Sequence, residues 1–131
     1  MEVLNVLAAA AGSWVFGAVW YMSLSKPWMQ AAGIPMDANG KPMGNGSPMP
    51  FVYSAICMVV VAGFMRHVFA TSGVTTPGAG LVAGLGVGLF FISPWILLNN
   101  AYTMRPMKLT LIDSGYATFG CASIGLILNL F

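Results

Sequence analysis

The stretch from Gly78 to Leu98, GAGLVAGLGVGLFFISPWILL, has 21 residues and no charged side chain. A helix rises about 1.5 Å per residue, so a helix of this length crosses the roughly 30 Å hydrocarbon core of a bilayer. Backbone groups inside lipid must find their hydrogen-bond partners within the protein, which favours a helix over a lone strand. The stretch therefore predicts a membrane-spanning helix over residues 78–98.

Three further stretches repeat this character. Residues 3–24 carry no charge, and residues 109–131 carry one acidic side chain between apolar runs. Residues 51–70 reach the length of a span only if Arg66 extends its guanidinium to the headgroups, as long basic side chains do. The sequence therefore predicts an all-α membrane protein, with four transmembrane helices packed as two hairpins in one domain of 131 residues.

The composition agrees with this interpretation and excludes several classes of protein. Hydrophobic residues make up 58% of the chain and charged residues 6%, whereas an ordinary soluble domain has about 25% charged residues. A soluble globular domain, a disordered segment and a disulfide-rich secreted domain are therefore excluded. The net charge of +2 is too small for a nucleic-acid partner, so the lipid bilayer is the expected environment.

The first stretch has to be compared with a secretory signal peptide, because Ala8–Ala10 resembles a cleavage site. A signal peptide begins with a positive segment and has a short apolar core. Here Glu2 is the charged residue before the apolar run, and that run continues well past the alanines. We therefore expect residues 3–24 to be retained as the first helix.

Residues 25–49 interrupt the pattern. The segment contains four prolines and four glycines, which end helices and favour turns. Asp37–Gly40 and Gly44–Gly46 have the composition of turns. The sequence predicts a loop outside the hydrocarbon, with room for one interfacial turn near Trp28–Gln30.

The basic residues set an expected orientation. Four spans place the first and third loops on one side, with four basic residues there against one on the other: Lys26, Lys41, Arg105 and Lys108 against Arg66. Loops rich in basic residues favour the cytoplasm. We therefore predict a multi-pass protein of the bacterial inner membrane, with loop 25–49 in the cytoplasm and both termini outside it.

Gly80, Gly84 and Gly88 recur every four residues and so share one face of the third helix. Such a face lets another helix approach backbone to backbone. The fourth helix has a similar row of small side chains, at Ala117, Cys121 and Gly125. The rows predict close helix packing and leave open whether the partner helix is internal or belongs to another chain. A phosphate-binding loop is not expected, since no strand precedes the glycines.

Asp113 is the most informative single residue, because a carboxylate inside a membrane is costly unless it is paired or hydrated. Five side chains are within plausible reach as partners: Lys26, Lys108, Asn99, Asn100 and Tyr21. Lys108 is five residues away and lies off the helical face of Asp113, so Lys26 or an asparagine is favoured. One interpretation is a structural clamp, in which the carboxylate satisfies backbone amides at the N-terminus of the fourth helix, aided by the helix dipole. The other interpretation is a site for a proton or a cation.

The remaining reactive side chains form no recognisable site. His67 is the only histidine, and Cys57 and Cys121 lack the spacing of a metal site. The ten methionines suggest Cu(I) only weakly, because copper sites usually also have Cys or His nearby. We predict no catalytic, metal-binding or cofactor-binding residues, no cofactor and no enzymatic activity.

Two pairs of segments carry a family resemblance. Gly17–Tyr21 is followed by Lys26–Met29, and Arg105–Leu109 runs into Leu111–Tyr116. These segments resemble the signatures of an uncharacterised family of short bacterial four-helix membrane proteins, a domain of unknown function. The chain departs from the family at Met22–Leu24, where Ser-Pro and Phe-Gly are usual. The resemblance implies the four-span fold over nearly the whole chain, and it implies no activity.

The sequence favours a structural or accessory membrane subunit that works as a homo-oligomer or with another membrane protein. The basis is that the helices offer packing surface and no reaction chemistry. The alternative is a small transporter or channel subunit with a polar site around Asp113.

Overall fold

The computed structural model describes residues 2–33 and 49–130. Its elements, in chain order, are α1 (Glu2–Ser23), α2 (Ser25–Ala32), α3 (Met49–Ser72), α4 (Pro77–Gly86), the π-helical turn η1 (Val87–Ile92), α5 (Ser93–Tyr102) and α6 (Met107–Leu128). No strand occurs within these two described ranges.

Four helical segments are long and apolar enough to cross a membrane: Val3–Ser23, Met49–Ser72, Pro77–Tyr102 and Met107–Leu128. The third of them consists of α4, η1 and α5 in direct succession. The predicted all-α class and the four spans are thereby confirmed. By length and composition, the chain has the build of a multi-pass membrane protein.

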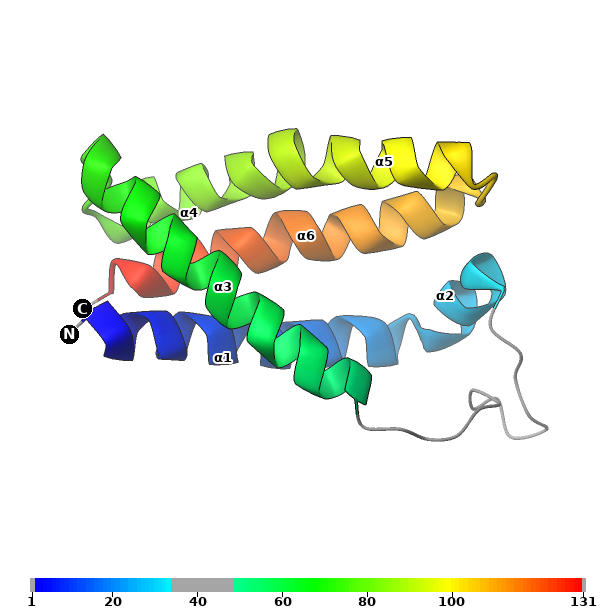
Figure 1. Cartoon of the computed structure of the whole chain (residues 1–131), viewed down its shortest axis with the longest axis horizontal. Helices are drawn as coiled ribbons and strands as arrows, with labels where there is room; N and C mark the ends of the chain where they lie inside the picture. Colours follow the sequence, from blue (N-terminus) through cyan, green and yellow to red (C-terminus); the bar gives the residue numbers. More distant parts are fainter. Residues whose placement is uncertain (1, 34–48, 131) are drawn as a thin grey trace.

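The central helix of the bundle is α6. It lies between α1 on one side and the span formed by α4, η1 and α5 on the other, while α3 crosses α1 and α6 obliquely (Figure 1). The two termini lie at the same end of the bundle (Figure 1). Since α6 contacts each of the remaining helical elements, side chains on α6 can meet partners from the whole fold.

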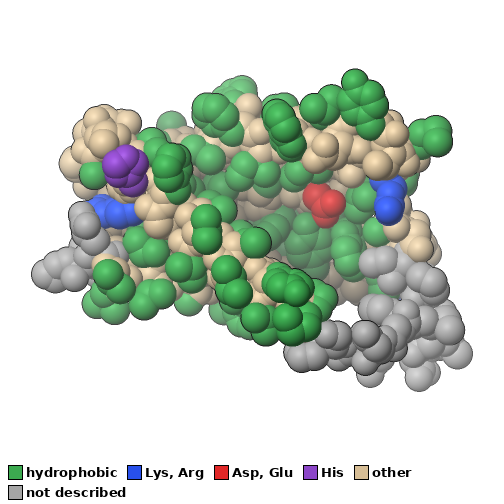
Figure 2. All heavy atoms as spheres, viewed as in Figure 1, with side chains coloured by type: hydrophobic (Ala, Val, Ile, Leu, Met, Phe, Trp, Pro, Cys, Tyr) green, Lys and Arg blue, Asp and Glu red, His purple; other side chains and the backbone are tan. Residues whose placement is uncertain are grey.

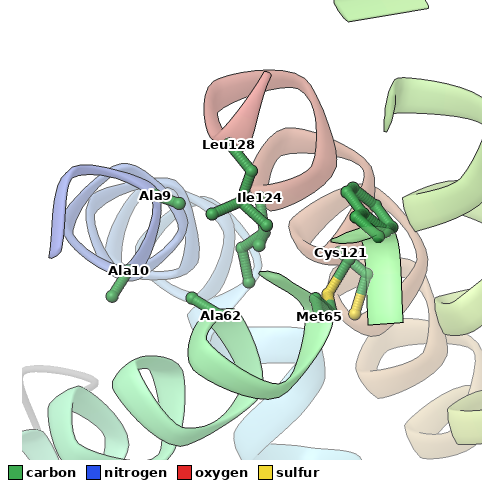
Figure 3. Packing of buried hydrophobic residues seen from close by; sticks show 8 residues of the cluster. Ala9, Ala10, Ala62, Met65, Cys121, Ile124 and Leu128 are labelled. Atoms are coloured by element: carbon green, nitrogen blue, oxygen red, sulfur yellow. The ribbon is translucent and has the colours of Figure 1, made fainter. Parts of the chain in front are cut away.

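A cluster of buried apolar residues joins α1, α3 and α6 (Figure 3). Three of its members are alanines, two from α1 and one from α3, and small side chains let helices approach closely. The cluster consists of Ala9, Ala10, Ala62, Met65, Phe69, Cys121, Ile124 and Leu128. Its members from α6 lie in the half of that helix that leads to the C-terminus, whereas Asp113 lies in the other half.

The three glycines of the third span lie against the backbone of α6. Cβ atoms built at Gly80, Gly84 and Gly88 would lie 2.2, 2.1 and 2.3 Å from the carbonyl oxygens of Gly125, Cys121 and Ala117, respectively. No side chain fits at those distances, so the two rows of small residues face each other within one chain. The energetic importance of this contact stays a prediction.

The segment predicted as loop 25–49 begins with a helix of eight residues, α2, which includes the predicted interfacial turn at Trp28–Gln30 and is longer than that turn. Pro27 lies in its first turn, where backbone amides have no partner within the helix, so a proline is tolerated there. Gly33 ends α2 in the left-handed region, with a φ of 74°. Residues 34–48, which include the predicted turns and Lys41, lie outside the described residues.

The third span continues to Tyr102, four residues beyond the predicted end at 98. Asn99 and Asn100 therefore belong to α5 and not to a connecting loop. The Asn100 side chain donates a 2.9 Å hydrogen bond to the Thr110 hydroxyl on α6. This bond satisfies the polar amide of Asn100 within the helix, although the sequence pattern predicted that Asn100 lies outside the span.

The π-helical turn η1 was not predicted, and Pro94 accounts for it. A proline has no amide hydrogen and its ring crowds the preceding turn, which disturbs regular helical bonding. The amide of Ser93 bonds to the carbonyl oxygen of Gly88, five residues earlier. The Ser93 hydroxyl bonds to the same oxygen at 2.6 Å, so the widened turn keeps its carbonyl satisfied.

Candidate functional site

Asp113 lies in the second turn of α6, about 9 Å along the helix axis from Met107 at the usual rise per residue. No other acidic residue occurs within the four spans. The side chain is partly buried. Because a carboxylate inside a span is costly unless it is paired or hydrated, its hydrogen-bond partners decide how it is stabilised.

Two aromatic side chains donate to the Asp113 carboxylate. The Tyr21 hydroxyl, at the end of α1, lies 2.7 Å from Oδ1. The Trp28 side chain of α2 is the second donor, through its indole N–H. The Tyr21 and Trp28 rings pack edge to face with centroids 5.5 Å apart. One carboxylate therefore links α1, α2 and α6.

Among the described residues, no hydrogen bond or ion pair joins Asp113 to the other predicted partners. Lys26 and Asn99 are exposed, and Asn100 bonds to Thr110. Asp113 does not cap its helix either: α6 begins after Pro106 without a side-chain cap, and helix-dipole effects fade beyond the first turn. The prediction that Asp113 caps the N-terminus of its helix is therefore wrong, whereas the predicted contact between Asp113 and Tyr21 is present.

Aromatic rings and glycines interlock between α1 and α6 next to the carboxylate. A Cβ atom at Gly115 would lie 2.5 Å from the Trp20 ring, and one at Gly17 would lie 2.7 Å from the Tyr116 ring. The indole N–H of Trp20 donates to the carbonyl oxygen of Ile112 at 3.0 Å. Each helix therefore supplies a glycine that makes room for the ring of the other.

Tyr116 extends this layer toward α3. Its hydroxyl donates to the Ser13 carbonyl oxygen at 3.1 Å and lies 3.3 Å from the Met58 sulfur. The Tyr21 and Tyr116 rings pack edge to face, with centroids 5.5 Å apart. Sequence reasoning did not single out Tyr116, Trp20 or Trp28 as site residues. The available signal was the adjacency of glycines and aromatic residues in two segments that meet in space.

A cavity of about 400 Å³ adjoins Asp113. All four spans contribute to its wall, through Tyr21, Met58, Ile92, Ile96, Asp113 and Tyr116 among others. Figure 2 shows an acidic side chain in a hollow of the molecular surface, surrounded by hydrophobic side chains. The carboxylate thus borders open volume as well as its two hydrogen-bond donors.

A second cavity, of about 390 Å³, lies between α1 and α3 beside Arg66 and His67. Cys57 is exposed on α3 and Cys121 is buried on α6. Within residues 2–33 and 49–130, no three His, Cys, Asp or Glu side chains gather as metal ligands would. The chemistry of the described site therefore rests on Asp113 and the aromatic residues around it.

Comparisons with known proteins identify a family and nothing closer. The family DUF1761, described as a protein of unknown function, matches residues 4–129. No curated protein and no solved structure matches the chain.

Proposed function

The chain belongs to DUF1761, a family of proteins of unknown function, and from the geometry around Asp113 we propose that it binds a cation inside the membrane, as a small transporter or channel subunit. Protons or other monovalent cations would pass by way of the Asp113 carboxylate. No covalent chemistry is part of this proposal.

The observation that carries the proposal is the position of Asp113 beside the 400 Å³ cavity. A charged side chain within a span is costly, and such residues commonly mark the path of an ion or a substrate. A carboxylate with a purely structural role is stabilised best when hydrogen-bond donors enclose it on all sides. Asp113 instead borders a space large enough to admit a ligand or water.

A structural or accessory subunit is the second candidate. It is supported by the hydrogen bonds of Tyr21 and Trp28, which join three helices at one carboxylate. In that case the protein works as a homo-oligomer or with another membrane protein. The two candidates differ in what the negative charge of Asp113 does. A structural subunit needs the charge only for stability, whereas a transporter needs it to bind the cation.

The orientation is part of the proposal. Lys26 follows α1, and Arg105 and Lys108 flank the start of α6, at the end of the bundle opposite the termini. Arg66 lies in α3 toward the other end. The excess of basic residues supports a cytoplasmic position for the Asp113 end of the bundle.

The experiment is a flux measurement on the full chain in proteoliposomes. A potassium gradient with valinomycin imposes a membrane potential, and an enclosed pH dye reports proton entry. Sodium and potassium fluxes are measured in parallel. We expect the wild-type protein to carry a flux and Asp113→Asn to abolish it while folding normally.

Asp37→Asn is the matched control, because it makes the same chemical change in the segment that the sequence predicts to be a loop outside the hydrocarbon. This variant should keep the wild-type flux. The proposal fails if the wild-type protein moves neither protons nor alkali cations, or if Asp113→Asn moves them at the wild-type rate.

A further inference from the structure

The cavity beside Asp113 has one strongly polar end and a largely apolar remainder. The polar end holds the carboxylate and the Tyr21 hydroxyl that donates to it at 2.7 Å. Farther along, the wall is formed by aliphatic side chains such as Val61, Ile92 and Ile96. A ligand that fits this wall has a charged or polar tip and an apolar body.

The donor set is poor for a divalent metal ion. Hard cations such as Ca²⁺ are held by six to eight oxygen atoms. Asp113 is the only carboxylate on this wall, and the Tyr116 hydroxyl is already bonded to the Ser13 carbonyl oxygen and lies near the Met58 sulfur. A cation that needs few oxygen ligands is the better match.

Aromatic rings supply the remaining attraction for positive charge. Tyr21 and Tyr116 both line the cavity, and their rings pack edge to face beside the carboxylate. Organic ammonium groups are attracted to the faces of such rings and to a carboxylate. The volume of about 400 Å³ lies within the range of small-molecule sites, roughly 300–1,000 Å³.

We infer that the cavity binds an organic ammonium ion with an apolar body, whose charged nitrogen pairs with Asp113 and whose body lies against Val61, Ile92 and Ile96. This inference rests on the proposed function, because it names the class of cation that the site accepts. Binding gives the partly buried, hydrogen-bonded carboxylate a positively charged partner beside the Tyr21 and Tyr116 rings.

The probe is benzyltrimethylammonium, which keeps its positive charge at every pH. Its uncharged isostere, neopentylbenzene, has the same shape without the charge. Binding to the purified full chain is measured calorimetrically in a neutral detergent. We expect the charged probe to bind more tightly than the isostere, and a large excess of sodium chloride to displace it only weakly.

Two pairs of variants locate the site. Asp113→Asn should weaken binding by about tenfold or more, because it removes one partner of a buried charge pair. Asp37→Asn should leave binding unchanged. Ile96→Trp fills the cavity and should also weaken binding, whereas Leu97→Trp, at an exposed position next to it in α5, should not.

The outcomes separate this inference from the proposed function. Equal binding of the charged probe and its isostere, or wild-type binding by Asp113→Asn, overturns the inference. If protons or alkali cations move through Asp113 and the ammonium probe does not bind, the inference fails and the proposed function stands. If the probe binds through Asp113 and the wild-type protein carries no flux, transport fails and the ammonium site stands.

Discussion

The Tyr21 hydroxyl donates a 2.7 Å hydrogen bond to Oδ1 of Asp113, across 92 residues of sequence. The preceding residue, Trp20, donates to the carbonyl oxygen of Ile112, which precedes Asp113. Two consecutive residues of α1 thus bond to two consecutive residues of α6. This pair of bonds fixes the register of the two helices and holds the carboxylate at the edge of the cavity.

Tyr21→Phe removes the hydroxyl and keeps the ring that packs against Trp28 and Tyr116. Interhelical hydrogen bonds in membrane proteins contribute about 0.6 to 2 kcal/mol each. We expect a modest fall in thermal stability in detergent, measured by the loss of helical circular dichroism on heating. Tyr102→Phe is the matched control, because Tyr102 is exposed at the end of α5 and should leave the melting curve unchanged. Equal melting of both variants would mean that the Tyr21 bond contributes nothing to folding.

Substitutions of Asp113 separate its charge from its hydrogen bonding. Asp113→Asn keeps one of the two acceptor oxygens, so it can still accept from the Tyr21 hydroxyl and should lose only a small part of the stability. Asp113→Leu leaves both donors without an acceptor, at about 1–3 kcal/mol for each buried group, so it should melt clearly below Asp113→Asn. The measurement is again thermal unfolding in detergent. A Leu variant as stable as the wild type would show that the two donors do not depend on the carboxylate.

The fold was largely predictable because its signals are local. The length and the polarity of a run such as residues 78–98 can be read directly from the sequence, and these two properties decide whether a helix spans the membrane. The exceptions also have local causes. Asn99 and Asn100 look like loop residues until the Thr110 hydroxyl on another helix satisfies one of them. Pro27 looks like a helix breaker until its place in the first turn of α2 is known.

The site was predictable only in part, because its contacts join distant segments. The cost of a carboxylate in a membrane singles out Asp113, and a phenol near the same interface is a reasonable partner. Trp28 could not be found in this way, since it lies in a segment expected to be a loop. The cavity likewise depends on how α3 crosses α6, and no periodicity in one sequence specifies that crossing.

The orientation is tested with a reporter enzyme. Alkaline phosphatase is active only when it is exported from the cytoplasm, so a fusion after Phe131 should be active. A fusion within residues 38–47 should be inactive, because the adjoining basic residues favour the cytoplasm. Immunoblots establish that both fusions are expressed. The reverse pattern, with an active loop fusion and an inactive C-terminal one, would invert the proposed topology.

The contact between the third span and α6 is tested with a pair of glycines in α4. Alanine is favoured over glycine in a helix by about 1 kcal/mol, so each Gly→Ala change starts with the same gain. A Cβ atom at Gly84 would lie 2.1 Å from the Cys121 carbonyl oxygen, whereas one at Gly86 would meet Phe90 at 4.0 Å, an ordinary contact. We therefore expect Gly84→Ala to lower the melting temperature in detergent and Gly86→Ala to leave it unchanged or raise it. Gly84→Ile should have a larger effect than Gly84→Ala, because its branched side chain forces the two backbones farther apart. If both alanine variants melt together, the close approach of α4 to α6 contributes no measurable stability.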